Sequence, residues 1–479
     1  MKITVRCGNK TLVLRADAPV RASTLLARCS FPFLLACGGN GTCGKCRLRA
    51  KGNLSTPDAA ECRLLGYEAL RSGIRLACRL ILCGDAELIL PPEEEKSRWI
   101  AMPPSEGEYD LAVDLGTTTL EAAALLPGTE RIFWEGNTEN RQRRYGADVI
   151  TRLAYAQKNG AQALRDALWE SIAALTAPLS PYRVRKTVFT GNTAMLHFAA
   201  GLPMDGFFSA PFTPASLFGT SQNGIFYPRC IDAFLGADLC CGIVACSLTE
   251  QKNALLLDLG TNCEMAFWDG ARLHCASAPA GPAFEGGNIR CGMRAEQGAI
   301  DRVFLRDGTV QFSVLGDAPP RGLCAGGLID LIAVLRRGDI ISESGYLKEP
   351  YRLTDNIVLL PEDVRAFQAA KAAASAGLRV LLHGKETASM LCLGGNFGTN
   401  LPLESAAALG LLPQDLLPKT VLCGNTALRG AAALLEQPDV CKSVEALAAA
   451  ADCVPLAGNT EFEKAFLQNM ALRPFTLHP

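Results

Sequence analysis

The chain has 479 residues, a formal net charge of −1 and a charged fraction of 20%. Such a balance offers no broad basic face for nucleic acid, although Arg141–Arg144 contains three arginines. No stretch of eighteen uncharged apolar residues predicts a membrane span, and Met1–Arg6 lacks the apolar segment of a signal peptide. We therefore expect a soluble cytoplasmic protein without a nucleic-acid or membrane partner.

Three cysteines near the amino terminus, Cys37, Cys43 and Cys46, form a Cys-x5-Cys-x2-Cys run. Glycines fill much of the spacing between them, and glycine permits the sharp turns that bring three thiolates around one inorganic centre. The pattern therefore predicts an iron–sulfur cluster. These glycines are Gly38, Gly39, Gly41 and Gly44.

A fourth thiolate must come from elsewhere, and Ile74–Arg79, where a short apolar segment begins, offers Cys78. Cys83 is the alternative, inside the predicted strand Leu80–Cys83. Cys62 falls in a predicted helix that opens at Thr56-Pro57-Asp58, where we expect it to be a small buried side chain. Most of the other cysteines stand singly among apolar residues and predict buried free thiols.

The spacing of these cysteines resembles that of the [2Fe–2S] ferredoxins of the plant and adrenodoxin kind over residues 1–92. The resemblance implies a [2Fe–2S] cluster held by four thiolates. A structural zinc site is the alternative, but such sites usually have two Cys-x2-Cys pairs. The alternating segments Ile3–Val5 and Leu12–Leu14 and the helical stretch Ser23–Cys29 predict an α+β fold of the β-grasp type.

Proline and charge then mark a linker, which we place at 93–108 before a large body at 109–479. In that body an apolar strand ends in Asp114, followed by Gly116, and the turn continues with three hydroxyl residues. A second apolar strand ends in Asp258, followed by Gly260. The remaining turn residues are Thr117, Thr118 and Thr119 in the first copy and Thr261, Asn262, Cys263 and Glu264 in the second.

Each turn predicts a phosphate-binding site, because glycine permits close approach, hydroxyls and amides donate to phosphate oxygens, and the aspartate can hold Mg²⁺. Two copies 144 residues apart indicate an internal duplication in which two related α/β lobes hold a nucleotide between them. A third segment, Val380–Leu382 and then Met390–Asn400, predicts an apolar strand with a Gly-Gly turn that packs against adenosine.

This order resembles the acetate-kinase, sugar-kinase, Hsp70 and actin (ASKHA) superfamily, which implies a two-lobed α/β ATPase with ATP and Mg²⁺ as ligands. No P-loop motif is present. The strings Thr190–His197 and Ala278–Ile289, with the ferredoxin-like front, narrow the resemblance to the reductive activators of corrinoid proteins. That family implies ATP-dependent electron delivery through the cluster to a Co(II) corrinoid protein, restoring Co(I) for methyl transfer.

The resemblance also implies roles. Asp114 and Asp258 would hold magnesium and position the attacking water, with Glu264 assisting. Residues Gly116–Thr119 and Gly260–Asn262 would bind phosphates. Gly394, Gly395 and Asn396 would face the nucleoside.

Several points stay open. The roles of Glu285 and Cys263, the corrinoid partner, the low-potential electron donor and the assembly state, with a homodimer among the options, are not fixed. Asn192 and Thr193, like Asn425 and Thr426, are expected to cap helices. His197 is expected in the core. Two other functions use the same folds: a small-molecule kinase with an accessory ferredoxin, and a nucleotide-binding redox sensor.

Overall fold

The computed structural model describes residues 1–7, 10–27, 31, 35, 39, 41, 44–90, 96–103, 107–385, 387–395 and 401–477. The chain forms two compact units, which are described one at a time. The first comprises Met1–Arg185 with Ala194–Ser216, and the second comprises Lys186–Thr193 with Leu217–Pro479.

The first ninety residues build a mixed sheet with the strand order β2-β1-β6-β4-β5, and β3 pairs with β6. β1 runs parallel to β6 and antiparallel to β2. Alternating residues such as Ile3 and Val5 are fully buried, together with Leu26 of α1. This is the predicted β-grasp arrangement. Its elements are β1 (Lys2–Cys7), β2 (Lys10–Arg15), β3 (Val20–Arg21), α1 (Ala22–Leu26), β4 (Arg47–Leu54), α2 (Ala59–Leu65), α3 (Tyr67–Arg71), β5 (Ile74–Leu76) and β6 (Ile81–Leu90).

The rest of the first unit is built on the antiparallel strands β8, β9 and β10, which α5 covers. The predicted linker contributes to this sheet, because β7 pairs with β10 and places Trp99 opposite Trp134. Trp99 also stacks on Phe133, with the ring centroids 6.0 Å apart. The elements are β7 (Lys96–Trp99), β8 (Glu108–Leu115), β9 (Thr119–Leu125), β10 (Ile132–Glu139), η1 (Arg141–Arg144), α4 (Val149–Asn159), α5 (Gln162–Thr176), η2 (Ala177–Leu179), α6 (Thr193–Ala200) and η3 (Asp205–Phe207).

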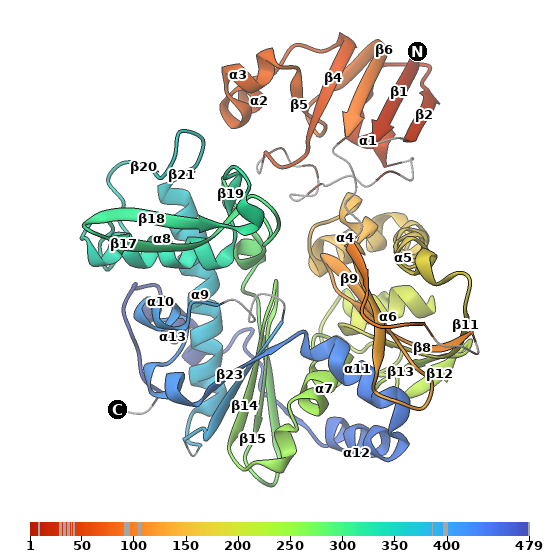
Figure 1. Ribbon diagram of the computed structural model, residues 1–479, viewed down its shortest axis with the longest axis vertical. Helices are drawn as coiled ribbons and strands as arrows, with labels where there is room; N and C mark the ends of the chain where they lie inside the picture. Colours follow the sequence, from red (N-terminus) through yellow and green to blue (C-terminus); the bar gives the residue numbers. More distant parts are fainter. Residues whose placement is uncertain are drawn as a thin grey trace. The chain divides into compact units, whose positions relative to one another are not determined.

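The second unit is built on a sheet with the order β23-β22-β14-β15-β16-β24. Its central strand β14 is apolar on both faces, as a strand covered on both sides must be. Leu255 and Leu257 face the core that includes α9, whereas Leu256 faces the core that includes α7 (Figure 1). The sheet and its two covering helices are β14 (Ala254–Leu259), β15 (Cys263–Trp268), β16 (Leu273–Ala278), β22 (Met390–Gly394), β23 (Thr420–Gly424), β24 (Asp452–Cys453), α7 (Ala237–Ala245) and α9 (Pro361–Leu382).

The predicted strand Val380–Leu382 is wrong, because these residues form the last turn of α9. Only Gly377 separates them from the alanine-rich part of the helix, and one glycine does not end a helix of this length, so the helix continues to Leu382, before Gly384. The remaining elements of the second unit are β11 (Arg183–Thr190), β12 (Thr220–Gln222), β13 (Ile225–Tyr227), η4 (Leu248–Glu250), η5 (Pro282–Glu285), β17 (Ala299–Arg306), β18 (Thr309–Val314), η6 (Leu315–Asp317), β19 (Gly322–Leu323), α8 (Ala325–Arg337), β20 (Tyr351–Arg352), β21 (Val358–Leu359), α10 (Leu403–Ala408), η8 (Gln414–Lys419), α11 (Thr426–Glu436), α12 (Pro438–Ala449) and α13 (Thr460–Gln468).

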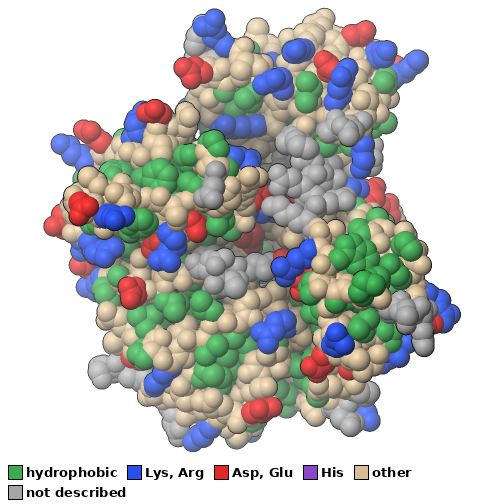
Figure 2. All heavy atoms as spheres, in the orientation of Figure 1, with side chains coloured by type: hydrophobic (Ala, Val, Ile, Leu, Met, Phe, Trp, Pro, Cys, Tyr) green, Lys and Arg blue, Asp and Glu red, His purple; other side chains and the backbone are tan. Residues whose placement is uncertain are grey.

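Charged side chains are mixed over the surface. On the face in Figure 2, Lys and Arg side chains are interspersed with Asp and Glu side chains among the described residues. The arginines of η1 are also paired with acids: Arg143 with Glu139, and Arg144 with Glu170. Arg144 is also buried, so the arginines of this basic run form ion pairs within the first unit.

Candidate functional site

Two of the predicted cluster ligands lie side by side in the first ninety residues. The Sγ atoms of Cys46 and Cys78 are 3.2 Å apart, and both side chains are buried. Cys83, the alternative to Cys78, is exposed on β6. Cys37 and Cys43 lie outside the described residues. The geometry therefore favours Cys78 over Cys83 as the partner of Cys46.

A buried ion pair positions Cys78. Arg75 on β5 and Glu61 on α2 are joined by two hydrogen bonds of 2.9 and 2.8 Å, and Glu61 also accepts from the Leu76 amide at 2.7 Å. Just beyond, the Ala77 amide donates to the Cys46 carbonyl at 2.9 Å. These bonds fix the end of β5 next to the loop that carries Cys46.

The cysteine loop also shows why glycine is needed there. Gly41 and Gly44 have φ of +75° and +65°, a region that favours glycine. A Cβ atom on Gly41 would lie 2.7 Å from Cδ of Arg79.

The prediction for Cys62 is wrong. Its side chain is exposed, because the face of α2 that packs inward carries Glu61 and Leu65.

The first aspartate turn, Asp114–Thr119, joins β8 to β9 as predicted. Asp114 is paired in register with Glu121 of β9, and both are partly buried. A Cβ atom on Gly116 would lie 2.3 Å from the Thr119 carbonyl oxygen, so the turn closes tightly only with glycine at that position. Thr117 and Thr118 are half-buried at its tip.

A buried polar network supports this turn from behind. The side-chain Nδ2 of Asn140 donates to the Gly116 carbonyl at 2.9 Å, and its backbone amide donates to the Thr118 carbonyl at 3.0 Å. Arg152 of α4 donates to the Thr117 carbonyl at 2.5 Å and to Gln142 Oε1 at 3.0 Å. Asn140, Gln142 and Arg152 are fully buried.

Sequence reasoning missed all three residues. Each of them lies on a different element from the turn it supports, and nothing in the local pattern connects them. The one available signal is Arg152, a charged residue on the apolar face of an amphipathic helix, because a fully buried arginine needs several acceptors.

The second aspartate turn, Asp258–Glu264, joins β14 to β15. Asp258 is paired in register with Glu264, which repeats the acid-to-acid pairing of Asp114 with Glu121. The Gly260 amide donates to the Asn262 carbonyl at 3.0 Å and closes the turn. The two turns therefore share strand pairing as well as sequence, as the predicted duplication requires.

Three neighbours surround the Asp258 carboxylate. Thr426 Oγ1 donates to its Oδ2 at 3.3 Å. Cβ atoms on Gly394 and Gly395 would lie 3.0 Å from Oδ2 and 2.7 Å from Oδ1, so a side chain at either position would crowd the carboxylate. Burial raises the pKa of Asp258 to about 6, while the Thr426 hydrogen bond opposes the rise. The predicted contact of these glycines with the nucleoside remains a prediction, and Asn396 lies outside the described residues.

Glu285, whose role the sequence left open, contacts the second turn. Its Oε1 accepts from Thr261 Oγ1 at 2.5 Å, and the Gly281 amide donates to the Thr261 carbonyl at 2.8 Å. Two residues of the Ala278–Ile289 string, Gly281 and Glu285, therefore hold Thr261 of the second turn in place. Cys263 is fully buried, and burial, together with the charges of Asp258 and Glu264, raises the pKa of its thiol.

A further acid, Asp238, belongs to this group. It lies in the first turn of α7, whose Ala237 amide donates to the Gly191 carbonyl at 3.0 Å. Burial raises the pKa of Asp238 to about 7; the Leu239 amide opposes the rise and the negative charge of Asp258 adds to it. Asp238 is the only charged residue of α7, which was the available signal in the sequence.

The helix-cap predictions have mixed outcomes. Asn425 caps α11 by accepting from the Leu428 amide at 2.8 Å, as predicted. Thr426 instead contacts Asp258, and Thr193 donates to the Asp232 carbonyl at 2.6 Å. His197 is fully buried against Phe207, which confirms its place in the core.

The acids, the amide-rich turns and the thiol pair are donor sets that fit Mg²⁺, phosphate and iron, respectively. No helix among the described residues is long and apolar enough to span a bilayer. The two aspartate turns fall in adjacent family regions. Residues 109–251 match the RACo middle region, and residues 252–478 match the C-terminal domain of RACo, the ASKHA domain.

Individual proteins match as well. Corrinoid activation enzyme RamQ of Eubacterium limosum is 26% identical over 85% of this chain and 74% of its own length. A [Co(II) methylated amine-specific corrinoid protein] reductase of Methanosarcina barkeri is 25% identical over 67% of this chain and 68% of its own. A solved reductive activator for corrinoid, iron-sulfur protein superposes with a TM-score of 0.70 at 24% identity, covering 98% of both chains.

Proposed function

Because the chain belongs to the RACo family of reductive activators of corrinoid proteins, we propose that it reduces an inactive Co(II) corrinoid protein to Co(I) at the expense of ATP. The Co(I) form is the one that accepts a methyl group in a methyltransferase system. The observation that carries this proposal is the match of the two family regions, end to end, from residue 109 to residue 478.

The electron enters through the amino-terminal domain in this proposal. Cys37, Cys43, Cys46 and Cys78 would hold a [2Fe–2S] cluster, which would supply a one-electron carrier. The support is the 3.2 Å separation of the Cys46 and Cys78 sulfurs, close enough for both to bind one metal ion, and their burial away from water. The electron donor is a low-potential reductant.

The aspartate turns act on ATP. The amides and hydroxyls of both turns bind phosphate oxygens, while Asp114 and Asp258 hold Mg²⁺. Asp238 and Glu264 lie with Asp258 on one side of the second turn, and the raised pKa of Asp238 suits a group that accepts a proton from the attacking water. We therefore assign hydrolysis chemistry to the second turn.

ATP is required because each roughly 59 mV by which the acceptor lies below the donor costs about 1.4 kcal/mol for one electron. Hydrolysis does not change the energy of the electron itself. It drives a conformational change that alters the partner's cobalt site, and so brings the cobalt potential within reach of the cluster.

The test is anaerobic mixing of the reduced protein with a Co(II) corrinoid protein, with and without MgATP, while the cobalt absorbance is followed. We expect Co(I) to form only with MgATP and wild-type protein. Cys78→Ser should lose the cluster absorbance and the reduction, and the matched Cys83→Ser should retain both. Equal reduction rates without ATP, or with Asp258→Asn, would refute the proposal.

ATP turnover stimulated by a sugar or a carboxylate, instead of by the corrinoid protein, would indicate a kinase. Binding of ATP without any turnover would indicate a sensor. A phosphate-release assay with a sugar, a carboxylate or the corrinoid protein added in turn tests for the kinase, and a nucleotide titration beside it tests for the sensor.

A further inference from the structure

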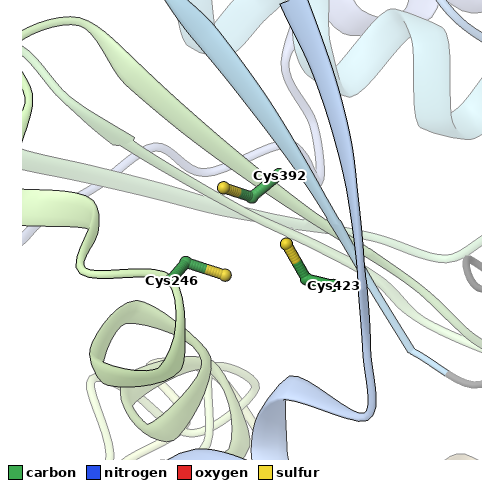
Figure 3. Close-up of side chains that lie close together, drawn as sticks. All are labelled: Cys246, Cys392 and Cys423. Atoms are coloured by element: carbon green, nitrogen blue, oxygen red, sulfur yellow. The ribbon is translucent and has the colours of Figure 1, made fainter.

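A second group of cysteines lies in the second unit, far along the sequence from the amino-terminal run. The sulfur atoms of Cys246, Cys392 and Cys423 all lie within 4.8 Å of one another. Figure 3 shows the three side chains pointing toward a common space from the end of α7, from β22 and from β23. None of the three is in a disulfide.

The register of the sheet brings two of them onto one face. Cys392 pairs with Val421 in the parallel ladder of β22 and β23, and Cys423 follows Val421 by two residues. Residues two apart in a strand share a face. The ladder then shifts between Leu393 and Gly394, so that Cys423 is the residue without a paired position on β22.

Close packing of α7 against the sheet brings the third cysteine, Cys246, to the other two. A Cβ atom on Gly242 would lie 2.9 Å from Cδ2 of Leu256, and one on Gly430 would lie 1.9 Å from the Cys241 carbonyl oxygen. Glycine at both positions therefore lets α7 approach the sheet and α11 closely. Cys246, at the C-terminal end of α7, is set opposite the two sheet cysteines.

The spacing suits one metal ion bound directly by the three sulfurs. A zinc–sulfur bond of about 2.3 Å with tetrahedral angles separates neighbouring sulfurs by about 3.8 Å. A [4Fe–4S] cluster would place each sulfur on a different iron, and a [2Fe–2S] cluster would divide the three sulfurs between two irons, so either cluster would spread the sulfurs further apart. The observed limit of 4.8 Å therefore favours a single ion.

The surroundings also allow an ion to enter. Cys392 is buried, whereas Cys246 and Cys423 are only partly buried. β23 is the edge strand of the sheet, and its Val421 is 48% exposed. Among the described residues, no fourth His, Cys, Asp or Glu joins the group, which leaves one coordination position for solvent or an added ligand.

We propose that Cys246, Cys392 and Cys423 form a three-thiolate site for one thiophilic metal ion of the Zn²⁺ class. The site is separate from the iron–sulfur ligands and from the two aspartate turns. Binding releases the thiol protons, so occupancy falls as the pH is lowered. The assignment does not depend on the proposed reaction with a corrinoid protein.

The test uses the full-length, cluster-loaded protein under anaerobic reducing conditions, with Co²⁺ as the spectroscopic probe. Cobalt bound by thiolates gives a charge-transfer absorption that the free ion lacks. We expect one Co²⁺ per chain with this signature, displaced stoichiometrically by Zn²⁺. The amino-terminal cysteines contribute equally to wild type and variants, so the difference between them isolates the three-thiolate site.

Cys246→Ser, Cys392→Ser and Cys423→Ser should each lose that one equivalent. Matched controls are Cys441→Ser for the partly buried positions and Cys275→Ser for the buried one, and both should keep it. Cys423→His provides a second check, because it retains a ligand and should bind Co²⁺ with a weaker charge-transfer band.

Equal Co²⁺ binding by wild type and all three serine variants would overturn the proposal. So would a wild-type protein that binds no Co²⁺ after full reduction, whether or not two of the thiols had been joined in a disulfide before. Circular dichroism of each variant identifies any loss of Co²⁺ binding that comes from unfolding. The Cys423→His variant then decides whether residue 423 is a metal ligand. Neither readout requires ATP turnover or a corrinoid partner.

Discussion

The two aspartate turns have the same strand pairing but different surroundings. The first turn, Asp114–Thr119, has its backbone carbonyls held by the buried side chains of Asn140 and Arg152. The second, Asp258–Glu264, is surrounded by groups that can exchange protons, among them Asp238. We therefore propose that the first turn mainly keeps its shape, whereas the second turn carries the acid–base chemistry.

The largest expected effect separates the two aspartates. Asp258→Asn should reduce ATP turnover at saturating MgATP by about 100-fold or more, because it removes a charge from the acid group that we propose positions the attacking water. Asp114→Asn should mainly weaken MgATP binding, by about tenfold, with turnover less affected. Steady-state phosphate release and nucleotide titration measure both. Equal losses of turnover would erase the distinction between the turns.

Support of the first turn is tested next. Arg152→Met leaves the Thr117 and Gly146 carbonyls without their buried donor, which should cost about 3 kcal/mol of unfolding free energy and raise the KM for ATP about tenfold. Urea unfolding and ATPase kinetics measure these. Lys158→Met, at an exposed position on the same helix, is the control and should match wild type.

The pH dependence of stability tests the second turn. Burial raises the pKa of Asp258 to about 6 and that of Asp238 to about 7, so the folded protein holds protons there that the unfolded chain has released. Stability contributed by these groups is full below about pH 4 and is lost as the pH rises through these values. Without nucleotide, the urea midpoint of wild type should therefore fall between about pH 5 and pH 8.

Asp238→Asn should make that fall smaller, since one of the two titrating groups is gone. Asp307→Asn, on the exposed turn after β17, should leave it unchanged. A midpoint of wild type that rises over this range would contradict the burial of the two acids.

The smallest expected effect concerns Glu285. Glu285→Gln keeps an acceptor for Thr261 but replaces a charge-assisted hydrogen bond with a neutral one, which should raise the KM for ATP about threefold. Glu285→Ala removes the acceptor and should raise it further. If neither variant changes the KM, the contact with Thr261 has no role in nucleotide binding.

The sequence predicted the parts of the site whose chemistry is local. Cys46 and the two aspartate turns follow from short spacings. Cys78 is preferred to Cys83 because its spacing from Cys46 resembles that of ferredoxins and because Cys83 falls inside a predicted strand; the proximity of Cys78 to Cys46 agrees with that prediction. The family resemblance is confirmed by the matches over residues 109–478. The β-grasp fold was predictable because strand alternation reports burial directly. The ASKHA fold was predicted from the resemblance of the two aspartate turns and the Gly-Gly turn to that superfamily.

The parts that could not be predicted depend on tertiary contacts. Asn140 and Arg152 reach the first turn from other elements, and Asp238 lies at the start of a helix whose place over β14 is set by Gly242. The wrong prediction for Cys62 has the same cause. Its helix was predicted correctly, but the helix face that turns inward was decided by the Glu61–Arg75 pair.

The pairing of β7 with β10 limits how far the first ninety residues can move from this sheet. Because Lys96–Trp99 is paired in the sheet, only six peptide units join Leu90 to Lys96, and a chain of that length spans at most about 22 Å in any conformation. The predicted linker, 93–108, would have allowed more than twice that radius. In the proposed function these residues carry the electron, so this radius limits how far the cluster can move from β7 toward a redox partner. Lengthening the connection would enlarge the radius and lower the local concentration of the domain near β7, without changing a single ligand.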